Sequence, residues 1–412
     1  MSLAEGVQGT IVYKAYASGA ITANTEDNAP GTSGGQTLRR VSSTLNLAKA
    51  TYTSAEIRAD RQIVDYRHGA RQVQGDIAGE LSPVTYFDFF EAVHRDTRSA
   101  GVTLTEADLT SVAASASGST FSFGGGDPVS DGLRAGDVMR FSSMAVAANN
   151  DRNFTIASFS GTSNRVVHVI PAPTDQTADT GFSLMRPGYA TAVPSSGHVS
   201  RKFGIEIAHQ DLDISRLFTE CRLTKYALSL PATGLGTVTF SVMGRGMRTL
   251  SAGASPYFVS PAAETTTGIV ASVNGALLLN GVAVGVVTGV TLTMDMPAEA
   301  ASVVGQNFGA EIFLGRNNLT GQITAYLEDT TFIDGFLDET EFELLLQLDT
   351  TSDEATPTIT LYLPRIKLGG ADVALTGEAG QVITANFQAL KYVGSTPGKP
   401  NTTIRIVDTE VA

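Results

Sequence analysis

Tryptophan is absent from this 412-residue chain, and cysteine occurs only once, at Cys221. A single thiol forms no disulfide within the chain and no cysteine-based zinc site. The five histidines also lack the close spacing that zinc ligands show; they are His68, His94, His168, His198 and His209. We therefore expect no metal ion and no other cofactor.

Charge is scarce as well, and basic charge is the scarcer sign. Lys and Arg number 28 against 41 Asp and Glu, which gives a formal net charge of -13, and charged residues make up 17% of the chain. The usual charged share is about 25%. A surface of this sign does not hold nucleic acid by neutralising phosphates. It is compatible with a surface that DNA passes transiently, without specific binding.

Long hydrophobic runs are missing too. The most apolar stretch, 268–290, is interrupted by Ser272, Asn274, Asn280 and repeated glycines, so we expect hairpins there and no membrane insertion. The N-terminal segment carries Glu5 and lacks a basic stretch followed by an apolar run, so it does not predict a signal peptide. Synthesis in the cytoplasm is the matching expectation.

The chain is rich in glycine, with 42 residues, and in short alternating patterns of apolar and polar side chains. This usage predicts a mainly β protein, and 412 residues exceed the comfortable size of one hydrophobic core. Alternation between residues 43 and 81 indicates half-buried strands. The apolar members are Leu45, Leu47, Ile57, Ile63, Val64, Val73, Ile77 and Leu81.

Two short helices are predicted among the strands. Ser82-Pro83 offers an N-cap and a first-turn proline, so the apolar spacing that follows predicts a helix over 83–95. A second short helix is predicted over 330–337. The stretch 23–37 is rich in Gly, Pro, Asn and Thr, which predicts an arm that becomes ordered only against a partner.

A strand pattern recurs late in the chain. The spacing Gly-x-Ile-x-x-x-Leu at 75–81 returns at 321–327, an offset of 246 (321 − 75). Matched aromatic and acidic residues follow in both places; they are Tyr86, Asp88 and Phe90, then Phe332, Asp334 and Phe336. We interpret the recurrence as duplication of one strand-helix unit.

The predicted architecture has duplicated β-sandwich or barrel units, each with a short helix, and a small inserted β-domain. Residues 1–104 are the N-terminal part of the first unit. Residues 105–185, with short strands between Gly-rich turns, are the insert. Residues 186–412 hold the remainder of the fold, including the second unit.

The run SAEIRADRQIVDYRHG at 54–69, continued by VQGDIAGELSPVTYFDFFEAV at 73–93, resembles the N-terminal signature of tail tube proteins from siphophages, which are viruses with long, non-contractile tails. The segment GLRAGDVMRFSSM at 132–144 also resembles the small β-domain inserted in some of these proteins. The resemblance implies a structural virion protein with no enzymatic activity. Its sheets join side by side into the wall of the tail tube, the conduit for DNA delivery into the host.

The resemblance further implies partners and a location. Copies assemble into stacked rings, and two tube domains per chain favour a trimer with pseudo-sixfold symmetry, with a hexamer as the alternative. Tail terminator, tape measure and tail tip proteins are the other implied partners. The location is the virion tail, after synthesis and assembly in the host bacterial cytoplasm. Ring closure also makes physical sense, because it pairs sheet edges that would otherwise promote aggregation.

Mixed charges on alternating strands suit contacts between subunits, although a solvated sheet face would carry the same pattern. The candidate interface residues are Arg58, Asp60, Arg61, Asp65, Arg67, Arg71 and Asp76.

Motifs for catalysis are weak. His94-Arg95-Asp96 imitates part of a kinase catalytic loop without its glycine-rich partner. Asp211 and Asp213 are better explained as solvated loop acids than as a carboxylate pair. The alternatives to a tail tube protein are a capsid decoration protein or adhesin and, less favoured, a carbohydrate-active enzyme. The last would need clustered aromatic and carboxylate side chains, which a chain without tryptophan does not suggest.

Overall fold

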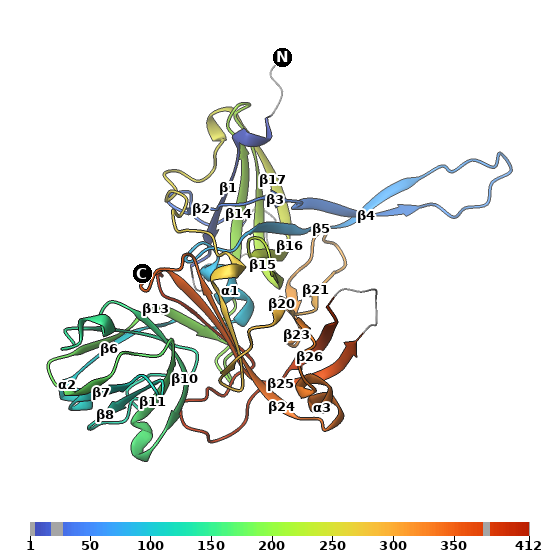
Figure 1. Ribbon diagram of the computed structural model, residues 1–412. Coiled ribbons are helices and arrows are strands. Elements are labelled where there is room, and N and C mark those ends of the chain that lie inside the picture. Colours follow the sequence, from blue (N-terminus) through green and yellow to red (C-terminus); the bar gives the residue numbers. More distant parts are fainter. Residues whose placement is uncertain (1–4, 18–27, 374–379, 412) are drawn as a thin grey trace.

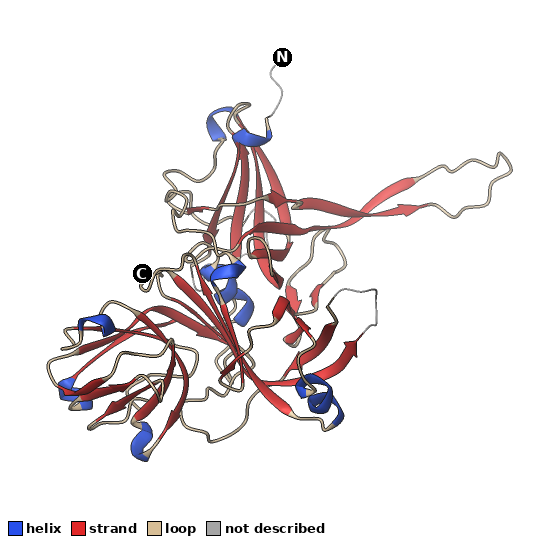
Figure 2. Cartoon of the chain, in the orientation of Figure 1, coloured by secondary structure: helices blue, strands red, loops and turns tan. Residues whose placement is uncertain are grey.

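A computed structural model describes residues 5–17, 28–373 and 380–411 of the chain. Antiparallel strands dominate, and helices are few and short (Figure 2). The fold is therefore mainly β, as the sequence predicts. Its elements form three groups, which we call the first unit, the insert and the second unit (Figure 1).

The bounds of the elements are as follows. The first unit contains β1 (Gly9–Ala15), β2 (Gln36–Thr37), β3 (Ser42–Ser43), β4 (Asn46–Thr53), β5 (Tyr66–Glu80), α1 (Phe87–His94), β14 (Phe203–His209), β15 (Ile214–Pro231), β16 (Thr237–Gly244) and β17 (Gly246–Ser251). The insert and its flanking strands contain β6 (Ser99–Thr105), α2 (Glu106–Leu109), β7 (Val112–Ser115), β8 (Thr120–Phe123), β9 (Val138–Ser142), β10 (Asn153–Ser160), β11 (Val166–Ile170), β12 (Gln176–Asp179) and β13 (Ser183–Ala192). The second unit contains β18 (Ala276–Leu279), β19 (Val282–Ala283), β20 (Val287–Asp295), β21 (Ala298–Ala300), β22 (Ile312–Leu314), β23 (Asn318–Tyr326), α3 (Thr331–Leu337), β24 (Glu341–Asp349), β25 (Thr358–Val373), β26 (Val382–Ala389) and β27 (Arg405–Asp408).

Eight of the described strands form one continuous antiparallel sheet, which we call the long sheet. Its order is β4, β5, β16, β15, β20, β23, β26 and β25. The first four strands belong to the first unit and the last four to the second. The halves meet where β15 pairs with β20, with Lys225 opposite Asp295 and Pro231 opposite Gly289. Backbone pairing therefore runs without a break from one unit into the other.

The second unit repeats the strand registers of the first. Val73 of β5 lies opposite Gly244 of β16, and Leu319 of β23 lies opposite Ala389 of β26. These positions are related by offsets of 246 (319 − 73) and 145 (389 − 244). The same two offsets relate every pair in the two ladders.

An irregularity is repeated as well. The β15–β16 ladder shifts register after Leu223, and the β25–β26 ladder shifts after Leu368, again 145 residues later (368 − 223). Bulges of this kind are specific structural features of a fold. Shared registers and a shared bulge mean that the recurrence seen in the sequence belongs to a duplicated strand arrangement.

The two helices pack on the apolar side of the long sheet, within one large core. The rings of Phe89 and Phe90 in α1 lie 5.3 and 5.2 Å from that of Phe240 in β16, a favourable edge-on geometry. In α3, Phe332 is buried, whereas Phe336 is 41% exposed. The helix of the second unit is therefore less completely covered than that of the first.

The start of α1 differs from the prediction. The helix begins at Phe87 rather than at 83, and Tyr86 occupies the N-cap position without a side-chain capping bond. The hydroxyl of Ser82 instead lies 2.7 Å from that of Thr85. Val84 has a φ of +71°, which no α-helix accommodates. The predicted capping role of Ser82 is wrong for that reason, while α3 begins within one residue of its predicted start.

The insert has an apolar cluster of its own and is also fixed to the second unit. Its buried residues range from Leu104 to Leu184 and include Phe121, Phe141 and Phe154. A second, smaller cluster joins the insert to the second unit; its members are Ala135, Ala157, Leu278, Leu345 and Tyr362. The insert therefore covers apolar side chains of β18, β24 and β25.

The predicted arm at 23–37 lies partly outside the described residues, which resume at 28. From there the backbone is held by the same chain. Tyr257 Oη donates to the carbonyl of Pro30 at 2.8 Å, and the N–H of Val259 donates to the carbonyl of Thr32 at 2.8 Å. The expectation that ordering needs a partner is wrong for 28–37, because a segment more than 200 residues away supplies the bonds.

Candidate assembly surfaces

The long sheet has an unpaired edge at each end. At one end, β3 and β4 pair with β5 on one side only. At the other end, residues 368–373 of β25 pair only with β26. Among the described residues, no strand covers the outer edge of either segment. Unpaired edges carry free backbone donors and acceptors, which makes them sites for pairing with another chain.

One face of the long sheet is open and polar. The side chains of alternate residues point away from the core and are mainly Thr, Ser, Asn and Gln; they include Gln74, Thr239, Ser241, Ser229, Thr291, Thr293, Thr320, Gln322, Thr384 and Asn386. Acidic side chains on this face are Asp76, Glu80, Asp295 and Asp372, and Lys225 lies there as well. The face combines small hydrogen-bonding groups with net negative charge.

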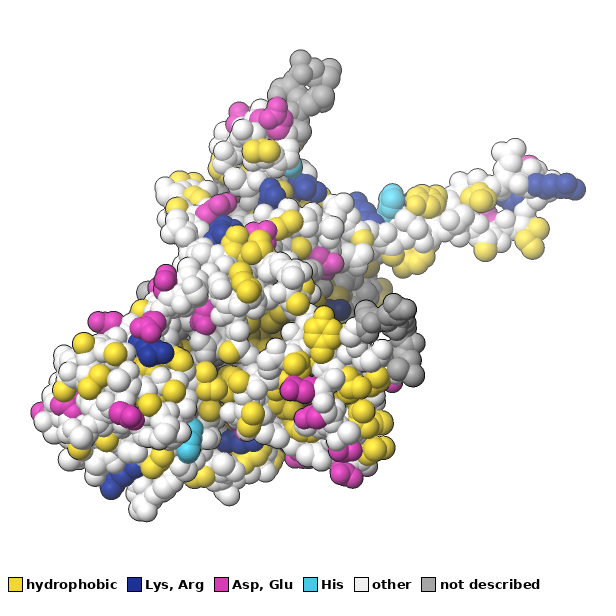
Figure 3. All heavy atoms as spheres, in the orientation of Figure 1, with side chains coloured by type: hydrophobic (Ala, Val, Ile, Leu, Met, Phe, Trp, Pro, Cys, Tyr) yellow, Lys and Arg dark blue, Asp and Glu magenta, His cyan; other side chains and the backbone are white. Residues whose placement is uncertain are grey.

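A hairpin made of β4 and β5 projects far from the body of the molecule (Figure 1). The connecting loop, 54–65, is exposed from Ala55 to Asp65 and carries basic side chains near its tip (Figure 3). Ile57 is 101% exposed and Ile63 is 74% exposed. The prediction of half-buried strand positions is therefore wrong for these residues and for Val64, because the loop extends beyond its own core.

The seven predicted interface residues divide into two groups. Five lie on the projecting hairpin, and they are Arg58, Asp60, Arg61, Asp65 and Arg67. Two ion pairs occur among them, Arg67 Nε with Asp65 Oδ2 at 2.9 Å and Arg58 Nε with Asp60 Oδ1 at 3.6 Å. These pairs are exposed, so each contributes little to the stability of the monomer.

The other two predicted residues lie nearer the body and contact their own chain. The N–H of Arg71 donates to the carbonyl of Asn307 at 2.8 Å. Asp76 accepts a 2.7 Å hydrogen bond from Ser241 Oγ on the open face of the long sheet. The structure therefore does not bring Asp76 together with the charges at the hairpin tip.

The sequence did not predict which residues form the two sheet edges. The offset of 246 relates β5 to β23 and was visible in the sequence. The duplication also relates β15 to β25, with an offset of 145, but there Tyr226 corresponds to Ala371, which has an unlike side chain. Only the register of the ladders reveals that these two positions correspond. The backbone, not the side chains, carries this signal.

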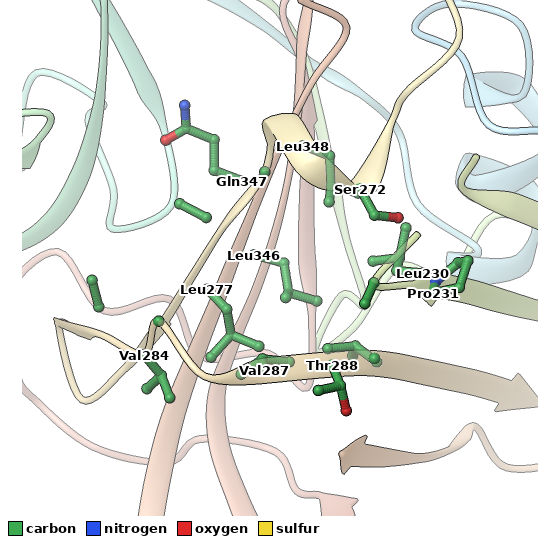
Figure 4. A pocket seen from close by; sticks show the side chains of 17 residues that line it. Leu230, Pro231, Ser272, Leu277, Val284, Val287, Thr288, Leu346, Gln347 and Leu348 are labelled. Atoms are coloured by element: carbon green, nitrogen blue, oxygen red, sulfur yellow. The ribbon is translucent and has the colours of Figure 1, made fainter. Parts of the chain in front are cut away.

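An apolar cavity of about 320 Å³ lies near the junction of the units (Figure 4). Leu230 and Pro231 from the end of β15 face Leu277, Val287 and Leu346 of the second unit across it. None of the described residues that line it has an ionisable side chain. General acid-base catalysis uses such a group, and these lining residues supply none.

The described ranges contain neither a cluster of metal ligands nor a membrane-spanning helix. No group of three or more His, Cys, Asp and Glu side chains in residues 5–17, 28–373 and 380–411 could hold a metal ion. No helix in the described part of the chain is long and apolar enough to cross a membrane.

Open sheet edges, a polar sheet face and a projecting hairpin are typical of structural subunits that pair with further copies of themselves. The family model for phage tail tube proteins matches residues 5–389, and the chain belongs to that family. It is accordingly a structural protein of the virion tail, from a family that self-assembles into a tube. No curated protein that was compared with the chain matches it.

Proposed function

We propose that three copies of the chain close into a ring through the two free edges of the long sheet, and that the rings stack into the tube of a non-contractile phage tail. The observation that carries the proposal is the junction between β15 and β20. Within one chain it joins the last strand of the first half-sheet to the first strand of the second. In a ring, the last strand of the second half-sheet, β25, meets the first strand of the next chain, β4, in the same way.

The register of this contact follows from the duplication. Leu47 lies opposite Val73 as Met294 lies opposite Leu319, so β4 maps onto β20 with an offset of 247 (294 − 47). β15 maps onto β25 with an offset of 145. Ala227 lies opposite Thr293 within the chain. The corresponding pair between chains is Asp372 with Asn46, where 372 is 227 + 145 and 46 is 293 − 247.

Repetition of this contact gives a closed wall with six similar half-sheets from three chains. Every edge of the long sheet is then consumed, which removes the aggregation hazard of the free subunit. A ring of six chains is the alternative stoichiometry. Three is favoured because each chain already supplies two half-sheets in one continuous sheet.

The open polar face supports a lumen for DNA. Thr, Ser, Asn and Gln side chains interact with water and offer no concentrated positive charge to phosphates. The acids Asp76, Glu80, Asp295 and Asp372 repel the phosphate backbone, so DNA passes without lasting contact. We place these four residues on the inner wall. The insert packs against strands of the second unit and leaves the open face of the long sheet uncovered, so we place the insert on the outside.

We also propose the division into residues 1–104, 105–185 and 186–412, and contacts with tail terminator, tape measure and tail tip proteins at the ends of the tube. The core of the insert, which is separate from the large core of the two units, supports the division. Assembly in the host bacterial cytoplasm fits the free, buried thiol of Cys221.

A paired-cysteine experiment tests ring closure. Asn46→Cys with Asp372→Cys places thiols on directly opposite positions of the proposed contact, where antiparallel Cα atoms are about 4.5–5.5 Å apart, within disulfide range. We expect oxidised assemblies to give covalent trimers on denaturing gels, and electron microscopy to show rings with three chains.

The matched control is Ala227→Cys with Thr293→Cys, the corresponding pair within one chain. It should form a disulfide without joining chains. Six chains per ring would replace the trimer with the hexamer. Purified protein that forms neither rings nor tubes, and whose cysteines at 46 and 372 stay reduced, would refute the proposed ring.

A further inference from the structure

The second unit has its own counterpart of the projecting hairpin, and this counterpart is not free. β21 and β22 pair with Ala298 opposite Leu314 and Ala300 opposite Ile312. In the projecting hairpin, Thr51 lies opposite His68 and Thr53 opposite Tyr66. The offsets are those of the duplication, 247 (298 − 51) and 246 (314 − 68). The loop at 301–311 therefore corresponds to the loop at 54–65.

The loop at 301–311 is docked on the first unit of its own chain. Phe308 contacts two guanidinium groups, with Arg245 Cζ 5.1 Å and Arg71 Cζ 6.0 Å from the ring centre. Arg245 Nε donates to the carbonyl of Gly309 at 2.7 Å. Glu311 then pairs with basic side chains of the sheet.

The pairs of Glu311 are partly shielded from water. Its carboxylate lies 2.8 Å from Arg222 Nη2 and 3.1 Å from Lys202 Nζ. Lys202 also pairs with Glu220, which is fully buried. The docked loop thus covers a cluster of charged side chains on the first unit and adds the carboxylate of Glu311 to it.

The same place on the second unit is uncovered. The pair of strands β14 and β15 in the first unit corresponds to the pair β24 and β25 in the second. Phe203 lies opposite Cys221 in the first pair, and Phe342 lies opposite Ile366 in the second. The offsets are 139 (342 − 203) and 145 (366 − 221). Lys202 and Glu220 thus correspond to Glu341 and Arg365, a pair of reversed sign. Glu341 and Arg365 are 44% and 33% exposed at their side chains, against 7% and 1% for their counterparts.

A cavity lies beside this exposed pair. It has a volume of about 600 Å³, and its lining includes Asn317 and Leu390 together with the basic side chains of Arg95, Arg316 and Lys391. The offsets of 246 (317 − 71) and 145 (390 − 245) relate Asn317 and Leu390 to Arg71 and Arg245. Those two arginines hold Phe308 on the first unit. The second unit therefore has an open counterpart of a site that is filled on the first.

We infer that loop 54–65 of one copy docks on this site of the neighbouring copy in the same ring. The inference rests on the proposed ring, which places the first unit of one chain beside the second unit of the next. The duplication identifies the occupant, because loop 54–65 corresponds to loop 301–311, which fills the equivalent site on the first unit. The exposed Ile57 and Ile63 supply apolar surface for the cavity.

Cysteines at corresponding backbone positions test the contact. Arg71 and Phe308 form a parallel bridge within the chain. The counterpart of Arg71 is Asn317. The counterpart of Phe308 is Arg61 or Gln62, because loop 54–65 is one residue longer than loop 301–311. Asn317→Cys is combined with Arg61→Cys, and separately with Gln62→Cys, in assembled tubes. We expect most chains of at least one combination to run as covalent trimers after oxidation. Arg61→Cys with Asp353→Cys, on an exposed loop elsewhere, is the control and should leave single chains.

A covalent ladder that extends beyond three chains would assign the loop to the next ring and overturn the inference. So would rings that close through Asn46 and Asp372 while both loop pairs stay reduced, and that result would leave the ring proposal intact. Failure of the protein to form any ring would overturn both.

Discussion

Gly136 of the insert lies directly against Tyr362 of β25, where an added Cβ would come within 2.5 Å of the Tyr362 Cβ. Gly136 also has a φ of +86°, which side chains rarely adopt. Close backbone approach and left-handed geometry coincide at this residue. It is therefore a sensitive point in the packing of the insert on the second unit.

We predict that Gly136→Ala destabilises the protein by roughly 2–4 kcal/mol, from backbone strain together with overpacking. The matched control is Gly181→Ala, because Gly181 has a similar φ of +83° but no heavy atom within 4 Å of an added Cβ. The control should lose only about 1 kcal/mol, the strain alone. Urea denaturation measures both, and equal losses would mean that contact with Tyr362 is unimportant.

Removal of the insert between 105 and 185 is expected to spare ring formation only if the surface beneath it is repaired. Val102 lies opposite Arg186, so residues 103 and 104 can form a two-residue turn that closes the gap. The deletion uncovers Leu278, Leu345 and Tyr362, an apolar patch that favours aggregation. Sedimentation and electron microscopy should show aggregates for the simple deletion and rings for a deletion with Leu345→Thr and Tyr362→Thr. If the repaired deletion forms no rings, the insert takes part in assembly.

The sequence predicted the β class and both helices because these depend on local patterns. Val73 and Ile77 alternate with polar residues and are fully buried, as expected. Ile57 and Ile63 show similar alternation and are exposed, since the pattern gives no information about how far a hairpin extends from the core. Identical local signals thus lead to opposite environments.

The candidate site was predictable only in part. Charges on 58–67 pointed to a contact surface, and the structure places them on a projecting hairpin. The edge at 368–373 had no signal in its side chains, because a strand is an edge only where no other strand lies beside it. That property is determined by the whole topology and not by any one segment.

The carboxyl group of Asp408 is predicted to make stability depend on pH. Burial raises its pKa to about 7, although the N–H groups of Val84 and Glu410 donate to it at 2.6 and 3.0 Å. The unfolded value is about 3.9. The folded state therefore binds this proton more tightly, so its contribution to stability is complete below about pH 4 and is lost as pH rises to about 7.

Asp408→Asn should remove this component. We expect the free energy of unfolding of the parent protein to fall more steeply between pH 4 and pH 7 than that of the variant, by a few kcal/mol in total at about 1.4 kcal/mol per pKa unit. Slopes are compared rather than absolute values, since the amide accepts fewer hydrogen bonds than the carboxylate. Asp353→Asn, on an exposed loop, should keep the parental slope. Identical slopes for the parent and Asp408→Asn would show that Asp408 does not titrate in this range.

Proline on the free edge of β25 separates folding from ring closure. Successive N–H groups of a strand point to opposite edges, so one of Ala371 and Asp372 donates outward and the other toward β26. Proline at the outward position removes a donor that only a neighbouring chain can use. We expect that variant to remain a folded monomer, with a melting temperature close to the parental value, and to form no rings in electron micrographs.

The control is Ala227→Pro on β15. Residue 227 corresponds to residue 372 but is paired with Thr239 on one side and Thr293 on the other. It should unfold the chain, because proline there disrupts strand pairing inside the monomer. Normal rings from both folded proline variants at 371 and 372 would show that the β25 edge is not the contact between copies.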